Sequence, residues 1–161
     1  MNAIEHPLTS TQLQRVIDAN AFSSWLQLRV HRVSKNGIEL HLPSRPEMLG
    51  TEALQRVHGG VISSLIDVAC GYAAMCVSGR GVSTVSLQTD FHRAGTPGAL
   101  RVEGCVVHLG GRLCTAHARV LDSAGTLLAS GRCTLYMSRE AHPALALNPP
   151  TAASPDASFQ R

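Results

Sequence analysis

The sequence HGGVISSLIDVA, residues 58–69, decides the fold because it sets one carboxylate in an apolar run that opens on two glycines. Apolar residues recur at steps of three and four, which predicts a helix (Val61, Leu65, Val68, Ala69, Tyr72, Ala73 and Cys76). Ile62, Ile66 and Val77 fill its flanks, so we expect the helix to be buried nearly all round. Since an unpartnered buried carboxylate is costly, Asp67 must be paired, protonated or turned toward a ligand.

The two glycines predict a binding function for the start of this helix. The first N–H groups of a helix have no intrahelical acceptor, and a glycine lets a ligand approach the backbone closely. Such N–H groups suit a developing negative charge, as in an oxyanion hole. Taken alone, Asp67 is explained equally well by a hydrogen bond to Ser63, Ser64 or a neighbouring strand. Gly59 and Gly60 favour the functional interpretation.

Composition limits the class of protein. The chain has 161 residues, which predicts one domain, and 14 Lys+Arg against 11 Asp+Glu give a net charge of +3. Because these charges are spread along the sequence, we expect no nucleic-acid partner, although local arginines suit an anionic substrate. The beginning of the sequence lacks the pattern of a signal peptide, and Asp67 and Gly71 interrupt the longest apolar stretch. We therefore expect a cytoplasmic protein without a membrane partner.

The remaining pattern predicts an α+β domain. Thr9 or Ser10 begins a peripheral helix that runs toward Trp25, and Asn36-Gly37 predicts a hairpin. A long loop spans residues 43–57, and four strands follow at 82–91, 99–109, 113–122 and 126–137, linked by tight turns. We expect a lead at 1–26, one domain at 27–138 and a disordered tail at 139–161. A curved antiparallel sheet wrapped around the long helix would bury it.

The residues resemble the PaaI-like acyl-CoA thioesterases, which have the hotdog fold. The resemblance covers residues 28–137 and rests on motifs in order: HGG at 58–60, LID at 65–67, VST at 82–84, DFHRAG at 90–95, GGR at 110–112 and DSAGTLLA at 122–129. It implies a hotdog fold with a long central helix and a curved antiparallel sheet of five to six strands. It also implies hydrolysis of a medium-chain or aryl acyl-CoA to free acid and CoA, with no cofactor or metal beyond the CoA of the substrate.

The resemblance implies a role for each matching residue. Asp67 takes the place of the acid that acts as nucleophile or as general base on water, and Thr84 that of the residue that orients the water. The Gly59 N–H, with Gly60 alongside, would polarise the thioester carbonyl, and His58 would assist the departing thiolate. Substrate contacts are expected from Glu52, where relatives often carry Asn or Gln, and from three further residues (Ser64, Arg93 and Arg112).

The spacing of the two central residues predicts a homodimer. Gly59 and Asp67 are eight residues apart, which on a straight helix separates them by about 12 Å, too far to meet on one carbonyl carbon. Two such helices, antiparallel across a two-fold axis, would bring Gly59 of one chain to Asp67 of the other. The family resemblance implies the same dimer, and whether dimers pair further into tetramers is left open.

Other functions compete with hydrolysis. A hotdog hydratase would need a His paired with the acid, and Asp67 lacks one four or five residues along the helix. A non-catalytic acyl-CoA-binding or regulatory module needs no further residue. A cysteine nucleophile with His108 or His117 is disfavoured, and we expect the five cysteines, odd in number and without a C-x-x-C motif, to be reduced core thiols. Metal binding by His31 and His41, or by His108 and His117, would need a convergent third ligand.

Overall fold

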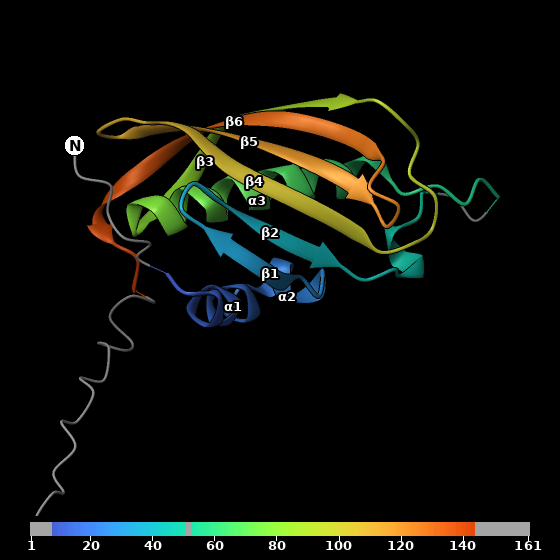
Figure 1. Cartoon of the computed structure of the whole chain (residues 1–161), viewed down its shortest axis with the longest axis horizontal. Coiled ribbons are helices and arrows are strands. Elements are labelled where there is room, and N and C mark those ends of the chain that lie inside the picture. The colour runs from blue at the N-terminus through green and yellow to red at the C-terminus, as the bar shows by residue number, and fades with distance from the viewer. Residues whose placement is uncertain (1–7, 51–52, 144–161) are drawn as a thin grey trace, which may run out of the picture.

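A computed structural model describes residues 8–50 and 53–143 of the chain (Figure 1). The helices are α1 (Ser10–Ala19), α2 (Ala21–Trp25), the 3-10 turn η1 (Pro46–Met48) and α3 (Gly59–Ser78). The strands are β1 (Arg29–Ser34), β2 (Gly37–Leu42), β3 (Arg80–Phe91), β4 (Leu100–Leu109), β5 (Leu113–Asp122) and β6 (Leu127–Ala141). The predicted α+β class is confirmed, and so are the hairpin at Asn36-Gly37 and the four later strands.

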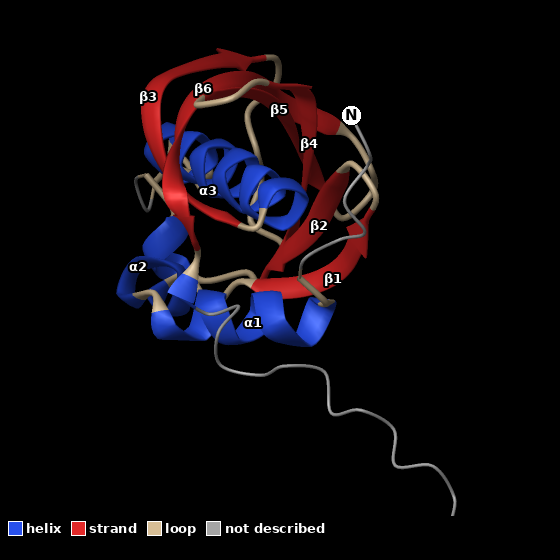
Figure 2. Cartoon of the chain, turned by 90° about the vertical axis from the view of Figure 1, so that its left-hand side faces the viewer, coloured by secondary structure: helices blue, strands red, loops and turns tan. Residues whose placement is uncertain are grey.

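The sheet curls around α3, as the apolar pattern of this helix requires (Figure 2). Its six strands are antiparallel in the order β1-β2-β4-β5-β6-β3, so β1 and β3 form the two edges. Two glycines permit close contact between strands and helix. A Cβ at Gly104 would lie 2.5 Å from the Ala69 carbonyl oxygen, and one at Gly131 would lie 2.7 Å from the Ile66 side chain. A long helix wrapped by a curved antiparallel sheet is the hotdog fold. The sheet has six strands, within the expected five to six.

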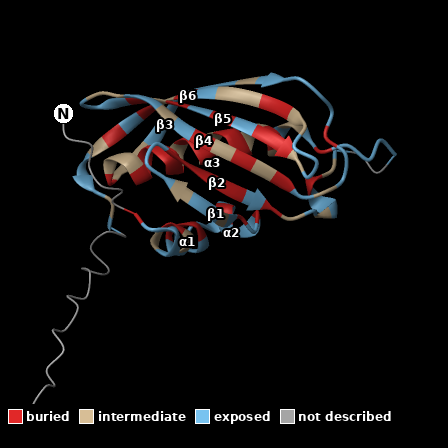
Figure 3. Ribbon diagram, viewed as in Figure 1, coloured by how far each residue is buried: buried red, intermediate tan, exposed pale blue. Residues whose placement is uncertain are grey.

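The prediction that α3 is buried nearly all round is wrong for one stripe of the helix. Ten of the twenty residues of α3 are buried, but a line of residues at steps of three and four is only partly covered or exposed (Gly60, Ser64, Asp67, Val68 and Gly71). Figure 3 shows the contrast between the buried inner surface and the more exposed parts of the ribbon. Asp67 therefore lies on the uncovered stripe and not in the core.

The N-terminal segment forms two helices where the sequence predicted one. Thr9 caps α1 in a capping box with Gln12, as expected from its residue type. Asn20 ends α1 in an extended conformation, and its side chain then accepts a hydrogen bond from the Ser23 N–H to cap α2. Figure 2 shows both helices below α3 and the sheet. A buried hydrogen bond, 2.8 Å long, joins the Ser23 hydroxyl on α2 to the Tyr72 hydroxyl on α3.

Two other expectations need correction. Cys105 is exposed on β4, whereas the other four cysteines are buried as expected. The tail does not begin at residue 139, because β6 continues to Ala141; residues 144–161 lie outside the described part of the chain.

By length and mean hydropathy α3 is apolar enough to cross a membrane, but this is weak evidence, because a core helix passes the same test and 56% of its apolar window is buried.

Candidate active site

Asp67, the candidate catalytic acid, is held by a hydroxyl from the neighbouring strand. Thr84 Oγ1 on β3 donates a 2.7 Å hydrogen bond to Asp67 Oδ1 on α3. Asp67 is partly covered, so the carboxylate keeps access to a ligand from the open side of α3. The hydrogen bond orients one carboxylate oxygen and leaves the other without a partner among the described residues.

A bulge in β3 sets the direction of Thr84. The pairing of β3 with β6 shifts between Thr84 and Ser86, so Val85 is the extra residue and is 62% exposed. On either side of the bulge, Thr84 and Leu87 pair with the buried residues Leu135 and Cys133 and therefore share the inner face. Thr84 is thus the residue that faces α3, and its neighbour Ser83 points outward.

The start of α3 distinguishes the two candidate oxyanion donors. His58 is the N-cap, and its Nδ1 accepts a 2.9 Å hydrogen bond from the Gly60 N–H. In a neutral imidazole this leaves the proton on Nε2, which can donate to a ligand. In the described part of the chain no acceptor is found for the Gly59 N–H. Gly59 therefore has the free donor, whereas the Gly60 donor is already used by His58.

A shallow hollow adjoins Gly59. A cavity of about 310 Å³ is lined by residues from the start of α3 and the end of β3 (Val57, Gly59, Ile62, Phe91, His92, Arg93, Ala94 and Gly95). A Cβ at Gly59 would lie 3.4 Å from the Phe91 ring, which covers the glycine. Arg93, an expected substrate contact, therefore lies next to Gly59 and is exposed. Phe91 belongs to the DFHRAG motif, but its contact with Gly59 could not be predicted, because only the folded strand brings it over the glycine.

The other expected substrate contacts are dispersed. Ser64 lies on the uncovered stripe, and its hydroxyl donates to the Gly60 carbonyl at 2.8 Å. Arg112 lies near the opposite end of α3, where Arg80, just past the helix, donates to the Gly111 carbonyl. There Arg112 donates to the Tyr136 hydroxyl at 2.7 Å, so in one chain it is not near Gly59. Glu52 lies outside the described residues.

The buried cysteines are unsuited to nucleophilic catalysis. Burial raises the pKa of Cys76 to about 12 and that of Cys114 to about 11, and the side-chain hydrogen bond with Cys133 together with burial raises the pKa of Cys70. A thiol with a raised pKa holds less of the reactive thiolate near neutral pH. These values agree with the expected inert core thiols.

Known proteins resemble this chain in sequence and in fold. The sequence model described as "Thioesterase superfamily" matches residues 54–129. A crystal structure of a protein from the thioesterase superfamily is 40% identical, with a TM-score of 0.77 over 81% of this chain and 98% of that one. The Salmonella typhimurium protein YigI, named a medium/long-chain acyl-CoA thioesterase, is 26% identical over 72% of this chain and 84% of its own.

A more distant structure supports the same fold. The Escherichia coli PaaI protein from the phenylacetic acid degradation operon shares 20% identity, with a TM-score of 0.73 over 82% of this chain and 97% of that one. At this identity the likeness concerns the hotdog fold alone. The predicted resemblance is confirmed by the closer sequence matches, and the chain is a hotdog-fold hydrolase that belongs to the thioesterase superfamily.

Proposed function

We propose that this hydrolase cleaves a medium-chain or aryl acyl-CoA to the free acid and CoA, at a site shared by two copies of the chain. The observation that carries the proposal is the oriented Asp67 carboxylate on the open stripe of α3, together with the Gly59 N–H at the start of the same helix, which has no acceptor among the described residues. The name of the YigI relatives favours an aliphatic medium-chain substrate over an aryl one.

The geometry of α3 supports a shared site. Asp67 and Gly59 belong to one unbroken helix, so their separation remains about 12 Å. Antiparallel packing of two α3 helices would set Gly59 of one chain opposite Asp67 of the other, with the axis midway, near Ser63. The small residues Gly60 and Ser64 on the stripe leave room for a second helix. Two equivalent sites would result.

The edge strand β3 also supports a dimer. In the described part of the chain one side of β3 pairs with β6 and the other side has no partner strand. This edge exposes large apolar side chains, with Val85 at 62% and Phe91 at 56%. The unpaired backbone groups of a long apolar edge strand can pair with another strand, and a second copy of β3 would cover this edge.

The proposed reaction uses only side chains and backbone of the two copies. The Gly59 N–H would polarise the thioester carbonyl, while the partner's carboxylate either takes a proton from an attacking water or attacks the carbonyl carbon itself. Collapse of the tetrahedral oxyanion breaks the carbon–sulfur bond and releases the CoA thiolate. The His58 Nε2–H would donate to this leaving group. In the second route, water then hydrolyses the anhydride on the carboxylate.

A cavity beyond Asp67 offers space for the acyl chain. It has a volume of about 560 Å³ and lies between α1, α3 and β3. Apolar side chains line much of it (Val16, Ala19, Tyr72, Met75 and Val82), and Gln12, Arg15 and His142 add polar groups. This volume is typical of small-molecule sites. We propose that the acyl chain extends from Asp67 along α3 toward Met75.

A thiol-release assay tests the function. Purified chain is given a panel of short, medium, long and aryl acyl-CoAs, and free CoA thiol is measured over time. The proposal expects turnover with a maximum at medium chains. Stoichiometric binding of acyl-CoA without thiol release would instead support a non-catalytic module. The dimer is tested by light scattering of the same preparation. After a single turnover in ¹⁸O water, label in Asp67 would identify the anhydride route.

A further inference from the structure

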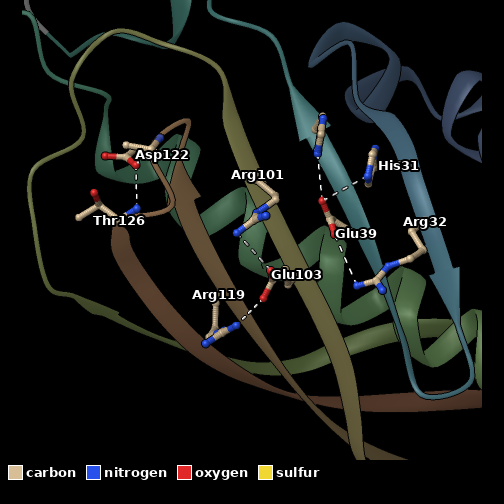
Figure 4. Close-up of polar contacts among 10 residues, drawn as sticks. His31, Arg32, Glu39, Arg101, Glu103, Arg119, Asp122 and Thr126 are labelled. Carbon is tan, nitrogen blue, oxygen red and sulfur yellow. Dashed lines mark hydrogen bonds and ion pairs between the residues drawn. The ribbon is translucent and has the colours of Figure 1, made fainter.

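Three potential metal ligands converge on the outer face of the sheet, away from α3. They are His31 on β1 and Glu39 and His41 on β2, and their ligand atoms all lie within 4.8 Å of one another. Glu39 Oε1 is 3.1 Å from His41 Nε2 and 3.9 Å from His31 Nε2. Figure 4 shows the Glu39 carboxylate between His31 and Arg32. Glu39 supplies the convergent third ligand that the histidine pair lacked in the sequence.

The hairpin is built so that these side chains meet. Glu39 and His41 are two residues apart on β2, and their neighbours Ile38, Leu40 and Leu42 face the core. The pairing of β1 with β2 shifts between Val30 and Arg32, which makes His31 the extra residue of a bulge. A bulge redirects a side chain, and here it brings the His31 ring onto the His41 ring, with centroids 4.5 Å apart.

The environment of Glu39 differs from that of its neighbour across the sheet. Glu103 pairs with Glu39 in the register of β2 and β4, and its two oxygens are held by Arg101 and Arg119. Around Glu39, by contrast, Arg32 lies 3.6 Å from Oε2 only, and Oε1 faces the two imidazoles. The Glu39 side chain is 10% exposed, so its direction is fixed by packing. One carboxylate oxygen is thus presented together with two ring nitrogens.

We propose that His31, Glu39 and His41 bind one divalent transition-metal ion of the Zn²⁺ type. Imidazole and carboxylate are common zinc ligands, and a set of two His and one Glu leaves a coordination position open. With zinc–ligand bonds of about 2.0–2.1 Å, tetrahedral ligand atoms lie about 3.3 Å apart. The observed separations reach this value through small rotations of the imidazoles, which are 57% and 46% exposed.

The surroundings of the three ligands give a metal ion access to solvent, and their place on two strands links metal binding to stability. A cavity of about 600 Å³ adjoins the three ligands and includes Arg101 and residues 122–125 on its wall, so water or a small ligand can reach the open position. The metal would join the edge strand β1 to β2. Its binding to the folded chain alone would raise the melting temperature. Because the ligands lie on the opposite face of the sheet from α3, thioester hydrolysis does not need this ion.

Metal titration tests the proposal. The full-length chain carries Cys105→Ser, because that thiol is exposed and is itself a metal ligand. After chelator treatment it is titrated with ZnCl₂ by calorimetry, and with Co²⁺ by visible absorption. The matched variants are His31→Ala and His41→Ala, with His108→Ala, also exposed on the sheet, as the control. Circular dichroism verifies that each variant folds.

We expect binding of one equivalent of Zn²⁺, absorption bands typical of low-symmetry Co²⁺, and unchanged binding in the control. Loss of either cluster histidine should weaken binding by more than about 100-fold, because loss of second-shell partners alone costs about 10–100-fold. Failure of the parent to bind one equivalent, or equal affinity in His31→Ala and the control, would overturn the proposal. Thioesterase activity measured with and without chelator should be the same, and a loss on chelation would contradict the separation of the two sites.

Discussion

Replacement of the central acid by its amide, Asp67→Asn, should nearly abolish turnover while the fold survives. Asparagine has almost the same size as aspartate, and its Oδ1 can still accept the Thr84 hydroxyl at 2.7 Å. What is lost is the negative charge and the ability to take a proton or to attack a carbonyl. Lost general-base catalysis costs a factor of about 10²–10⁴ in kcat, equal to about 2.7–5.4 kcal/mol in the activation barrier.

The stability of the variant should change little. Asp67 is only partly covered and lies on the open stripe of α3, so the free energy of unfolding should shift by less than about 1 kcal/mol. Thiol release by purified Asp67→Asn is compared with that of Asp18→Asn, which removes an exposed carboxylate paired with Arg29. The control should retain wild-type kcat. If Asp67→Asn kept kcat within tenfold of wild type with an unchanged melting curve, the proposed role of this acid would be wrong.

Three further predictions concern the surroundings of Asp67. Thr84→Val removes the hydrogen bond to the Asp67 carboxylate, which is worth about 1.5–3 kcal/mol, so kcat should fall about 10- to 100-fold. Thr84→Ser keeps a hydroxyl and should retain most of the wild-type kcat. A fully active Thr84→Val would contradict the orienting role. Met75→Trp narrows the proposed acyl cavity and should lower kcat/KM for long acyl-CoAs more than for acetyl-CoA. The control Val107→Trp, on the outer face, should not show this dependence on chain length. An equal decrease for all lengths in Met75→Trp would count against that cavity. At pH 8 the raised pKa values keep Cys70, Cys76 and Cys114 protonated, and burial also shields Cys133. Iodoacetamide should therefore label Cys105 first, as measured by peptide mass spectrometry, without loss of activity. Early labelling of Cys76 would refute its burial.

The main elements were predictable because their signals are local. The apolar period of α3, the Asn36-Gly37 turn and the alternating strands each reflect the geometry of a single element. The family resemblance named both Asp67 and Thr84, but it gave Thr84 the role of orienting the water, and the hydrogen bond between the two side chains is seen only in the folded structure. By contrast, the uncovered stripe of α3 was missed, although most of its residues (Gly60, Ser64, Asp67 and Gly71) are smaller or more polar than those of the buried faces. Only the folded sheet shows which face of the helix it leaves open.

The bulges show where sequence patterns fail. The extra residues Val85 and His31 carry no distinctive sequence signal, yet each changes which side chains share a face. The strict alternation of Glu39 and His41 is visible in the sequence, but the approach of His31 to these two residues depends on the bulge in β1. Likewise, the break between α1 and α2 depends on the capping bonds of Asn20, which compete with a continuous helix.

The proposed active site, with Gly59 of one chain and Asp67 of its partner, is tested by two inactive variants together. Gly59→Pro removes the N–H at the first helical position, where proline is tolerated, and His58 already has the extended conformation that a residue before proline prefers. Gly59→Ala is its control, because it adds a Cβ near Phe91 but keeps the N–H.

The decisive measurement is the activity of a purified heterodimer that carries Asp67→Asn in one chain and Gly59→Pro in the other. Each homodimeric variant should lose about 10²-fold or more in kcat, by loss of the acid or of the oxyanion donor. In the heterodimer, a shared site combines the intact Gly59 of one chain with the intact Asp67 of the other, so one of the two sites is complete. We expect about half of the wild-type activity. A heterodimer as inactive as its parents would contradict a site shared by Gly59 of one chain and Asp67 of the other.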